Sequence, residues 1–275
     1  MTLSNGLGMR YYEWPGDGPV LVCLHPSSGY GRMWDAMAGV LDGRLRVFAL
    51  DQRGHGDTDR PDGSYTAEEY AVDLHLFLEQ LGLGRAIVAG HSLGGRVAQV
   101  FAATHPDQAA AIVLVGGPHY SNFFQERDRV AAVLDGAQAM RASRTEFPSP
   151  EAAAEYLRSF RATDSEESRR HRLRHNMRPL PGGGVAFKYD NIRVAQGLTH
   201  LAEDLSPYAA RVTCPVAIVR GAASTHLTRE EAERVAPLWR DSRIIEVDGD
   251  YGLQMENPGG LARAVLEFVG AAVTA

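Results

Sequence analysis

Cysteine is scarce in this sequence, with only Cys23 and Cys214 among 275 residues. Each lies in or beside an apolar run, where a buried and reduced thiol is the usual state. Neither belongs to a spacing that resembles a set of metal ligands. The sequence therefore predicts no disulfide framework and no metal site, and no motif in it requires a cofactor.

Long apolar runs are also missing, since no uninterrupted stretch approaches the ~20 residues that cross a bilayer. The first residues, MTLSNGLGMRYYEW, lack a basic region followed by an apolar one. We therefore expect a cytoplasmic protein with no membrane partner. The net charge of -6 gives no electrostatic argument for nucleic acid as a partner. Lysine is almost absent, with Lys188 the single lysine among 28 lysines and arginines, which is typical of a GC-rich bacterial genome.

The composition that remains is that of an ordinary globular protein, with 44% hydrophobic and 23% charged residues. A chain of this length commonly folds as one α/β unit. Short apolar runs alternate with helical patterns, which predicts a mostly parallel central sheet flanked by helices. The predicted strands are Val20–Leu24, Arg46–Leu50, Ala86–Gly90, Ala111–Val115, Pro215–Val219 and Ile244–Val247, and the clearest predicted helices are Thr66–Leu81 and Leu261–Val269.

A region of different character interrupts this alternation. Residues 121–200 contain helical stretches at Arg127–Met140 and Glu151–Phe160, an arginine- and histidine-rich segment, and a Pro-Gly-Gly-Gly turn at 181–184. No strand pattern is evident there. We predict a helical cap inserted between two parts of one core, residues 1–120 and 201–275. The arginines between Arg169 and Arg178 are interpreted as a solvated helix face in preference to an anion-binding clamp.

The most informative segment is AIVAGHSLGGRVAQVFA, in which a strand leads into Gly90-His91-Ser92-Leu93-Gly94 and then into a helix. Gly-x-Ser-x-Gly in this context is typical of a sharp strand-to-helix turn whose flanking glycines avoid clashes. Ser92 is then presented at the end of a strand, beside the amides that begin a helix. It is the candidate nucleophile.

These features resemble the α/β-hydrolase superfamily, and the resemblance extends over nearly the whole chain. LVCLHPSSGYGRMWDAM is similar to the family's oxyanion strand and loop, ALDQRGHGDTDRP to its Asp-x-Arg-Gly-x-Gly-x-Ser loop, and MENPGGLARAV to the entry of its last helix. The resemblance implies that the backbone amides of Leu93 and of Ser27 or Ser28 form an oxyanion hole. Pro26 has no N–H to offer.

The same resemblance assigns supporting roles to other side chains. It implies that His25 and the Asp51–Gly56 loop shape the site, as do His91 beside the serine and Trp34, which we expect to line the pocket.

The resemblance does not extend to the acid and the histidine that usually assist the serine. The acid position in the phrase Arg220-Gly221-Ala222-Ala223-Ser224 is Ala223, and the histidine position, five residues before Glu256, is Tyr251. No histidine occurs after His226. Because a serine hydroxyl needs an imidazole to take its proton, ordinary hydrolysis does not follow from the motif alone.

Two histidines remain as substitute bases, His119 and His226, in loops expected to open on the same cleft; each is also interpretable as an ordinary pocket or surface residue. Three functions stay open. The favoured one is a non-hydrolytic enzyme, such as a lyase, isomerase or cyclase of bacterial secondary metabolism. It would hold a small hydrophobic carbonyl compound in the oxyanion pocket with Tyr251 as a proton or hydrogen-bond donor. The second is a serine hydrolase that uses His119 or His226, and the third is a protein that only binds a small ligand. The oligomeric state is not predicted.

Overall fold

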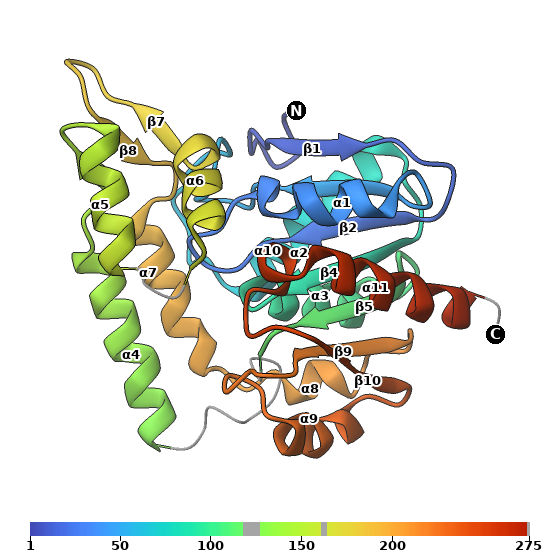
Figure 1. The fold of residues 1–275 in the computed structure, drawn as a ribbon. Coiled ribbons are helices and arrows are strands. Elements are labelled where there is room, and N and C mark those ends of the chain that lie inside the picture. The colour runs from blue at the N-terminus through green and yellow to red at the C-terminus, as the bar shows by residue number, and fades with distance from the viewer. Residues whose placement is uncertain (118–126, 161–163, 274–275) are drawn as a thin grey trace.

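The computed structural model describes residues 1–117, 127–160 and 164–273. A seven-stranded sheet in the order β1-β3-β2-β4-β5-β9-β10 forms its centre (Figure 1). Strand β1 runs antiparallel to β3, and the other neighbours pair in parallel. The strands are β1 (Tyr11–Trp14), β2 (Val20–Leu24), β3 (Arg46–Leu50), β4 (Ala86–His91), β5 (Ala109–Val115), β9 (Val216–Gly221) and β10 (Ser242–Val247).

The predicted parallel strands are confirmed, two of them with the predicted bounds, because each contains a short apolar run, which is largely buried in all of them but the edge strand β10. Alternate residues of one strand enter different cores: Val22 and Leu24 of β2 belong to one apolar cluster, and Leu21 and Cys23 to another. Both cysteines are free and buried. Strand β1 was not predicted, because its four half-exposed residues at the sheet edge lack an apolar run.

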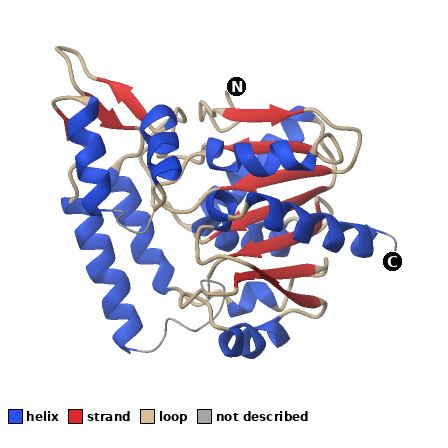
Figure 2. Cartoon of the chain, viewed as in Figure 1, coloured by secondary structure: helices blue, strands red, loops and turns tan. Residues whose placement is uncertain are grey.

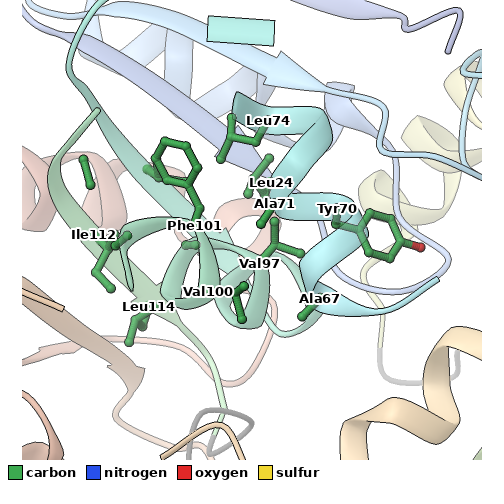
Figure 3. Close-up of a cluster of buried hydrophobic side chains, with 14 of the residues drawn as sticks. Leu24, Ala67, Tyr70, Ala71, Leu74, Val97, Val100, Phe101, Ile112 and Leu114 are labelled. Carbon is green, nitrogen blue, oxygen red and sulfur yellow. The ribbon is translucent and has the colours of Figure 1, made fainter. Parts of the chain in front are cut away.

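Helices cover both faces of the sheet. Helices α2 and α3 supply the first cluster, which Figure 3 shows around Leu74, Val97 and Phe101. Helices α1 and α11 supply the second and cross the near face of the sheet in Figure 1. The bounds of the core helices are η1 (Gly31–Trp34), α1 (Asp35–Leu41), α2 (Ala67–Leu81), α3 (Leu93–Thr104), α8 (Ser206–Ala209), α9 (Arg229–Val235), η4 (Ala236–Leu238), α10 (Leu253–Glu256) and α11 (Pro258–Val273).

Helix α2 illustrates how local sequence sets the element bounds. The hydroxyl of Thr66 accepts a hydrogen bond from the amide of Glu69 and caps the helix start. At the other end Gly82 adopts φ 62°, the left-handed conformation that ends helices. The predicted helix Thr66–Leu81 is thus confirmed, with Thr66 as its cap.

The inserted region forms a layer of its own beside the sheet (Figures 1 and 2). Its helices are as predicted at α4 and α5, but the expectation that it holds no strands is wrong, since three short strands pair in the order β6-β8-β7. These strands are too short to show an alternating pattern. The elements are α4 (Arg127–Ala142), β6 (Glu146–Phe147), α5 (Pro150–Phe160), α6 (Glu166–His175), β7 (Met177–Pro179), β8 (Val185–Phe187), α7 (Asn191–Thr199) and η3 (His200–Ala202).

The Pro-Gly-Gly-Gly turn joins the last two of these strands. Gly182, Gly183 and Gly184 all have positive φ, and the amide of Leu180 donates to the carbonyl of Gly184 at 3.1 Å. Within the described parts of the chain, no helix combines the length and the apolar character that spanning a membrane requires.

Candidate active site

The serine turn has the strained geometry that its glycine pattern predicts. Ser92 lies between β4 and α3 with φ 53° and ψ −111°, and only 6% of it is exposed. A Cβ at Gly90 would lie 2.1 Å from the carbonyl oxygen of Gly94, and one at Gly94 would lie 2.3 Å from that of Leu24. Both contacts are with backbone, so neither position has room for a side chain.

Two amides beside Ser92 come from different elements. Leu93 is the first residue of α3, and the first amides of a helix have no acceptor within it. In the loop after β2, Ser28 has φ 58°, and its amide donates to Nε2 of His55 at 3.1 Å. That N–H is already engaged, which leaves the amide of Ser27 as the other candidate that the resemblance names.

His25 and His55 hold this loop in place. Nδ1 of His25 donates to the carbonyl of Pro26 at 2.8 Å, and its Nε2 accepts from the amide of Gln52 at 3.0 Å. Nδ1 of His55 donates to the carbonyl of Arg53 at 2.9 Å. Burial lowers the pKa of His55 to about 4, and burial, then the neighbouring His55, hold the pKa of His25 well below its ordinary value. Both are neutral loop-shaping residues.

Trp34 lies elsewhere than the expected pocket wall. Its side chain is completely buried in the apolar cluster between the sheet and helices α1 and α11. Residues 31–34 form a 3-10 helix that leads directly into α1. This short helix directs the Trp34 ring into the core. The structure therefore places Trp34 as a core residue.

The loops that should carry the acid and the histidine lie side by side. The amide of Ala222 donates to the carbonyl of Val247 at 2.8 Å, and that of Ala223 donates to the carbonyl of Gly249 at 3.0 Å. Ala223 therefore stands in the loop after β9 next to the loop after β10. Its methyl group can neither accept nor donate a proton.

Tyr251 occupies the second loop, half-buried between two imidazoles. Its ring centre is 4.4 Å from that of His91 in an edge-to-face contact and 4.3 Å from that of His226 in a stacked one. The carboxylate of Glu256 accepts from the amides of Asp250 at 2.8 Å and Gly252 at 3.0 Å, on either side of Tyr251. Glu256 thus fixes the backbone that presents the phenol.

His91 and His226 differ in their surroundings. His91 is buried, and its Nδ1 lies 2.9 Å from Nε2 of Gln254. His226 is exposed, and its amide donates to Oγ of Ser224 at 3.2 Å. The structure therefore brings His91, Tyr251 and His226 together beside the serine turn. His119 lies outside the described residues.

The loop after β5 closes the same corner. A Cβ at Gly116 would lie 2.8 Å from Nε2 of His91 and 3.0 Å from the carbonyl oxygen of Tyr251. This close approach requires a glycine, and the two described residues of this loop, Gly116 and Gly117, have no side chain that could supply an acid.

The cap reaches the site through α6, which sequence reasoning missed. Nη1 of Arg172 lies 3.3 Å from the carbonyl oxygen of Ser28, and Nδ2 of Asn176 lies 3.5 Å from it. The interpretation of a solvated helix face is correct for Arg170 and Arg174 but wrong for Arg172, of which 6% is exposed. No local signal distinguishes Arg172 from its neighbours in the sequence, because its burial depends on packing against a distant loop.

One cluster has side chains of the kinds that bind metal ions. Asp35 on α1 and His171 and His175 on α6 each offer a ligand atom, all within 4.8 Å of one another. Oδ2 of Asp35 already accepts from Nε of Arg32 at 2.8 Å, and Nδ1 of His171 lies 2.8 Å from the hydroxyl of Tyr30. Burial lowers the pKa of His175 to about 4. Existing partners thus account for the arrangement of Asp35 and His171.

Comparison with known proteins finds relatives that are similar over more than nine-tenths of the chain. The 2-(acetamidomethylene)succinate hydrolase of Mesorhizobium japonicum is 28% identical over 258 residues, which cover 93% of this chain and 90% of the relative. A crystal structure of E-2-(acetamidomethylene)succinate hydrolase superposes with a TM-score of 0.85 at 27% identity and 96% coverage of both chains. An esterase of Mycobacterium tuberculosis is 30% identical over 261 residues, covering 94% of this chain and 83% of the esterase.

A sequence profile of the alpha/beta hydrolase fold family matches residues 19–241. The sheet order and the serine turn agree with this match, and the chain belongs to the alpha/beta hydrolase fold family.

Proposed function

We propose that this chain is a serine-dependent hydrolase that cleaves an acyl bond of a small molecule, with Ser92 as nucleophile and His226 as base. One observation carries the proposal: the strained Ser92 stands at the start of helix α3, and His226 stacks on Tyr251, the residue that the family resemblance places at the usual histidine position. The named hydrolase and esterase relatives support the same reaction class. This choice reverses the preference for non-hydrolytic chemistry that follows from the sequence alone.

The reaction follows the general scheme of acyl transfer. Oγ of Ser92 attacks the substrate carbonyl while its proton passes to the imidazole of His226, directly or through one water. The developing oxyanion is stabilised by the amides of Leu93 and Ser27. When the acyl–heteroatom bond breaks, the protonated imidazole returns its proton to the leaving group. A water molecule activated by the same imidazole then hydrolyses the acyl-enzyme.

Tyr251 is a positioning residue in this scheme. In an ordinary triad a carboxylate holds the imidazole in one orientation and stabilises its charged form. Among the described residues no carboxylate bonds to the His226 ring, and Ala223 cannot supply one. The stacked phenol ring instead restricts the plane of the imidazole, and an aromatic face also favours the imidazolium that forms. We expect slow turnover, because stacking orients less well than a hydrogen-bonded carboxylate.

The proposal is tested with 4-nitrophenyl esters of short acids. We expect saturable release of 4-nitrophenol that is abolished in Ser92→Ala and falls about a hundredfold in His226→Ala, the size of a lost general base. His105→Ala is the matched control, because His105 is a half-exposed imidazole at the far end of α3. It should leave the rate unchanged.

The outcomes separate the assignments. Release that persists in Ser92→Ala would exclude the serine as nucleophile. If release of 4-nitrophenol needs Ser92 but not His226, the base is another imidazole. His119 would then be the first residue to substitute. An absence of release from every ester, with the fold intact, would refute hydrolysis.

A second function follows from the sequence, in which Ala223 and Tyr251 stand where the family resemblance places the acid and the histidine. An oxyanion pocket without an organised base suits a reaction that polarises a carbonyl and takes a proton from a phenol, as in a lyase or isomerase. A phenol with a pKa near 10 is a usable acid and a poor base. In that case Tyr251→Phe would abolish the native reaction.

A further inference from the structure

Arg172 is a buried cation of the cap. Its side chain projects from α6, Nη1 donates to the carbonyl oxygen of Ser28 at 3.3 Å, and its guanidinium carbon lies 5.7 Å from the centre of the Tyr30 ring. Its Nε is buried and has no hydrogen-bond partner. Among the described residues no carboxylate pairs with it.

Other buried arginines of this chain are better satisfied. Arg53 forms two hydrogen bonds with Asp73, at 2.6 and 2.9 Å, and Arg220 pairs with Glu246. Arg96 donates to two backbone carbonyls, those of His200 and Glu203, at 2.8 and 3.1 Å. A buried charge without such partners is costly, so Arg172 has unused capacity for an anion.

The position of Arg172 relates this capacity to the active site. The carbonyl it reaches belongs to Ser28, the residue after Ser27, whose amide is the proposed oxyanion donor. Asn176, one turn further along α6, reaches the same carbonyl, is completely buried, and has no partner for Oδ1. Two buried polar side chains therefore come from the cap to the edge of the oxyanion loop, and of their unpaired atoms only Nε of Arg172 is a donor that can bind an anion.

We propose that the substrate carries a carboxylate that pairs with Arg172, so that the hydrolysed compound is a short acyl derivative of a dicarboxylic acid. Nε and a terminal nitrogen of a guanidinium form a parallel pair of donors that matches a carboxylate. The inference rests on the proposed function, because it places the second carboxyl group of a substrate whose carbonyl sits at Ser92. It makes the cap the part of the chain that selects the substrate.

The first test compares two esters of similar size, the 4-nitrophenyl half-ester of succinic acid and 4-nitrophenyl pentanoate. We expect kcat/KM to be at least about tenfold higher for the charged ester. Arg172→Met should remove this preference by lowering kcat/KM for the half-ester alone. Arg174→Met is the matched control, since Arg174 is on the same helix and exposed, and it should keep the preference. Arg172→Lys should retain part of it, because the charge remains without the planar fork.

A second test does not depend on turnover. Succinate should raise the thermal midpoint of the unmutated protein, its neutral analogue succinamide should not, and Arg172→Met should lose the succinate effect. Without ligand, Arg172→Met should unfold at the same or a higher temperature, because an apolar side chain replaces an unpaired buried charge.

These measurements distinguish the two proposals. Arg172-dependent stabilisation by succinate without any ester hydrolysis would refute the hydrolase and keep the carboxylate site. Hydrolysis with equal rates for the two esters, unchanged in Arg172→Met, would keep the hydrolase and overturn the carboxylate site. A large fall in the unliganded midpoint of Arg172→Met, with the ester preference intact, would likewise overturn it and make Arg172 a purely structural clamp.

Discussion

The candidate active site lies at one edge of the sheet, and the two sides of that edge differ in how firmly their residues are held. On the side of β2 and β4, Gly90 and Gly94 leave no room for a side chain, since a Cβ there would lie 2.1 and 2.3 Å from backbone oxygens, and buried histidines bond the neighbouring loops. On the side of β9 and β10, Ala223, His226 and Asp250 are exposed and Tyr251 is half-buried. Steric contacts and buried hydrogen bonds fix the first half, whereas the second half presents the side chains that the chemistry would use. The chemistry can therefore change while the architecture stays.

The largest expected effect tests the steric half. Gly90→Val and Gly94→Val should each destabilise the fold by ~3 kcal/mol or more, because a Cβ would overlap backbone atoms that cannot move aside. That loss corresponds to a fall of roughly 10 °C in the thermal midpoint. Ser92→Ala should change it by less than about 2 °C, since the serine meets a chemical demand only.

Gly39→Val provides the matched control, because Gly39 is exposed on α1 and a Cβ there would meet nothing within 4 Å. If calorimetry gave all four variants the same midpoint, the contrast between the two halves would not hold.

The next effect tests the chemical half. The double change Ala223→Asp with Tyr251→His should create a triad at the positions that the family resemblance assigns, and raise ester hydrolysis at least about tenfold above the unmutated protein. Either change alone should give little, because acid and imidazole act as a unit. Steady-state kinetics of the four proteins measure the coupling, and adding Ser92→Ala to the double variant should abolish the gain. Additive effects of the two changes would mean that these loops do not face the serine.

A pH effect of intermediate size should arise from His55 in the rigid half. The pKa of His55 is lowered to about 4 in the folded protein, against an ordinary value of 6.5. The unfolded chain therefore binds protons first as the pH falls below 6.5, and the free energy of unfolding decreases toward pH 4. The contribution of His55 between pH 7.5 and pH 5 is of order 2 kcal/mol.

Denaturant titrations of His55→Gln across this range should give a shallower dependence of stability on pH than the unmutated protein, even where the variant is less stable throughout. Identical slopes for the unmutated protein and His55→Gln would contradict the neutral, buried assignment of His55.

The smallest effect concerns the phenol. Under the hydrolase proposal Tyr251→Phe keeps the ring stacked on His226, and kcat should change by less than about threefold. Tyr251→Leu removes the aromatic face and should lower kcat about tenfold. Rates of ester hydrolysis measure both. A complete loss in Tyr251→Phe would favour the non-hydrolytic function and return the phenol to the role of proton donor.

How far the sequence could predict the structure differs between the same two halves. The apolar strands and the Gly-x-Ser-x-Gly turn predicted the sheet and Ser92, because buried runs and steric glycines leave local marks. Counting from Glu256 predicted the loop of Tyr251, and the structure gives the reason in the bonds from Glu256 to both neighbours of Tyr251.

Features that depend on distant packing were out of reach. Strands of two or three residues in the cap are too short to form an alternating sequence pattern. The sequence also does not show that Trp34 is buried in the core, because its burial depends on how its helix packs. Arg172 is buried by a loop 144 residues away. Nothing in its own segment distinguishes it from Arg170 or Arg174.

The attachment of the cap to the nucleophile helix has an evolutionary consequence. Arg96 and Gln99 of α3 bind the carbonyls of His200, Glu203 and Leu205, where the chain returns from the cap to the core. Helix α3, which precedes the insertion, therefore fixes the segment at which the chain returns to the core. A cap of different length or sequence would therefore be expected to leave Ser92 in place only if the chain returned to these same contacts with α3.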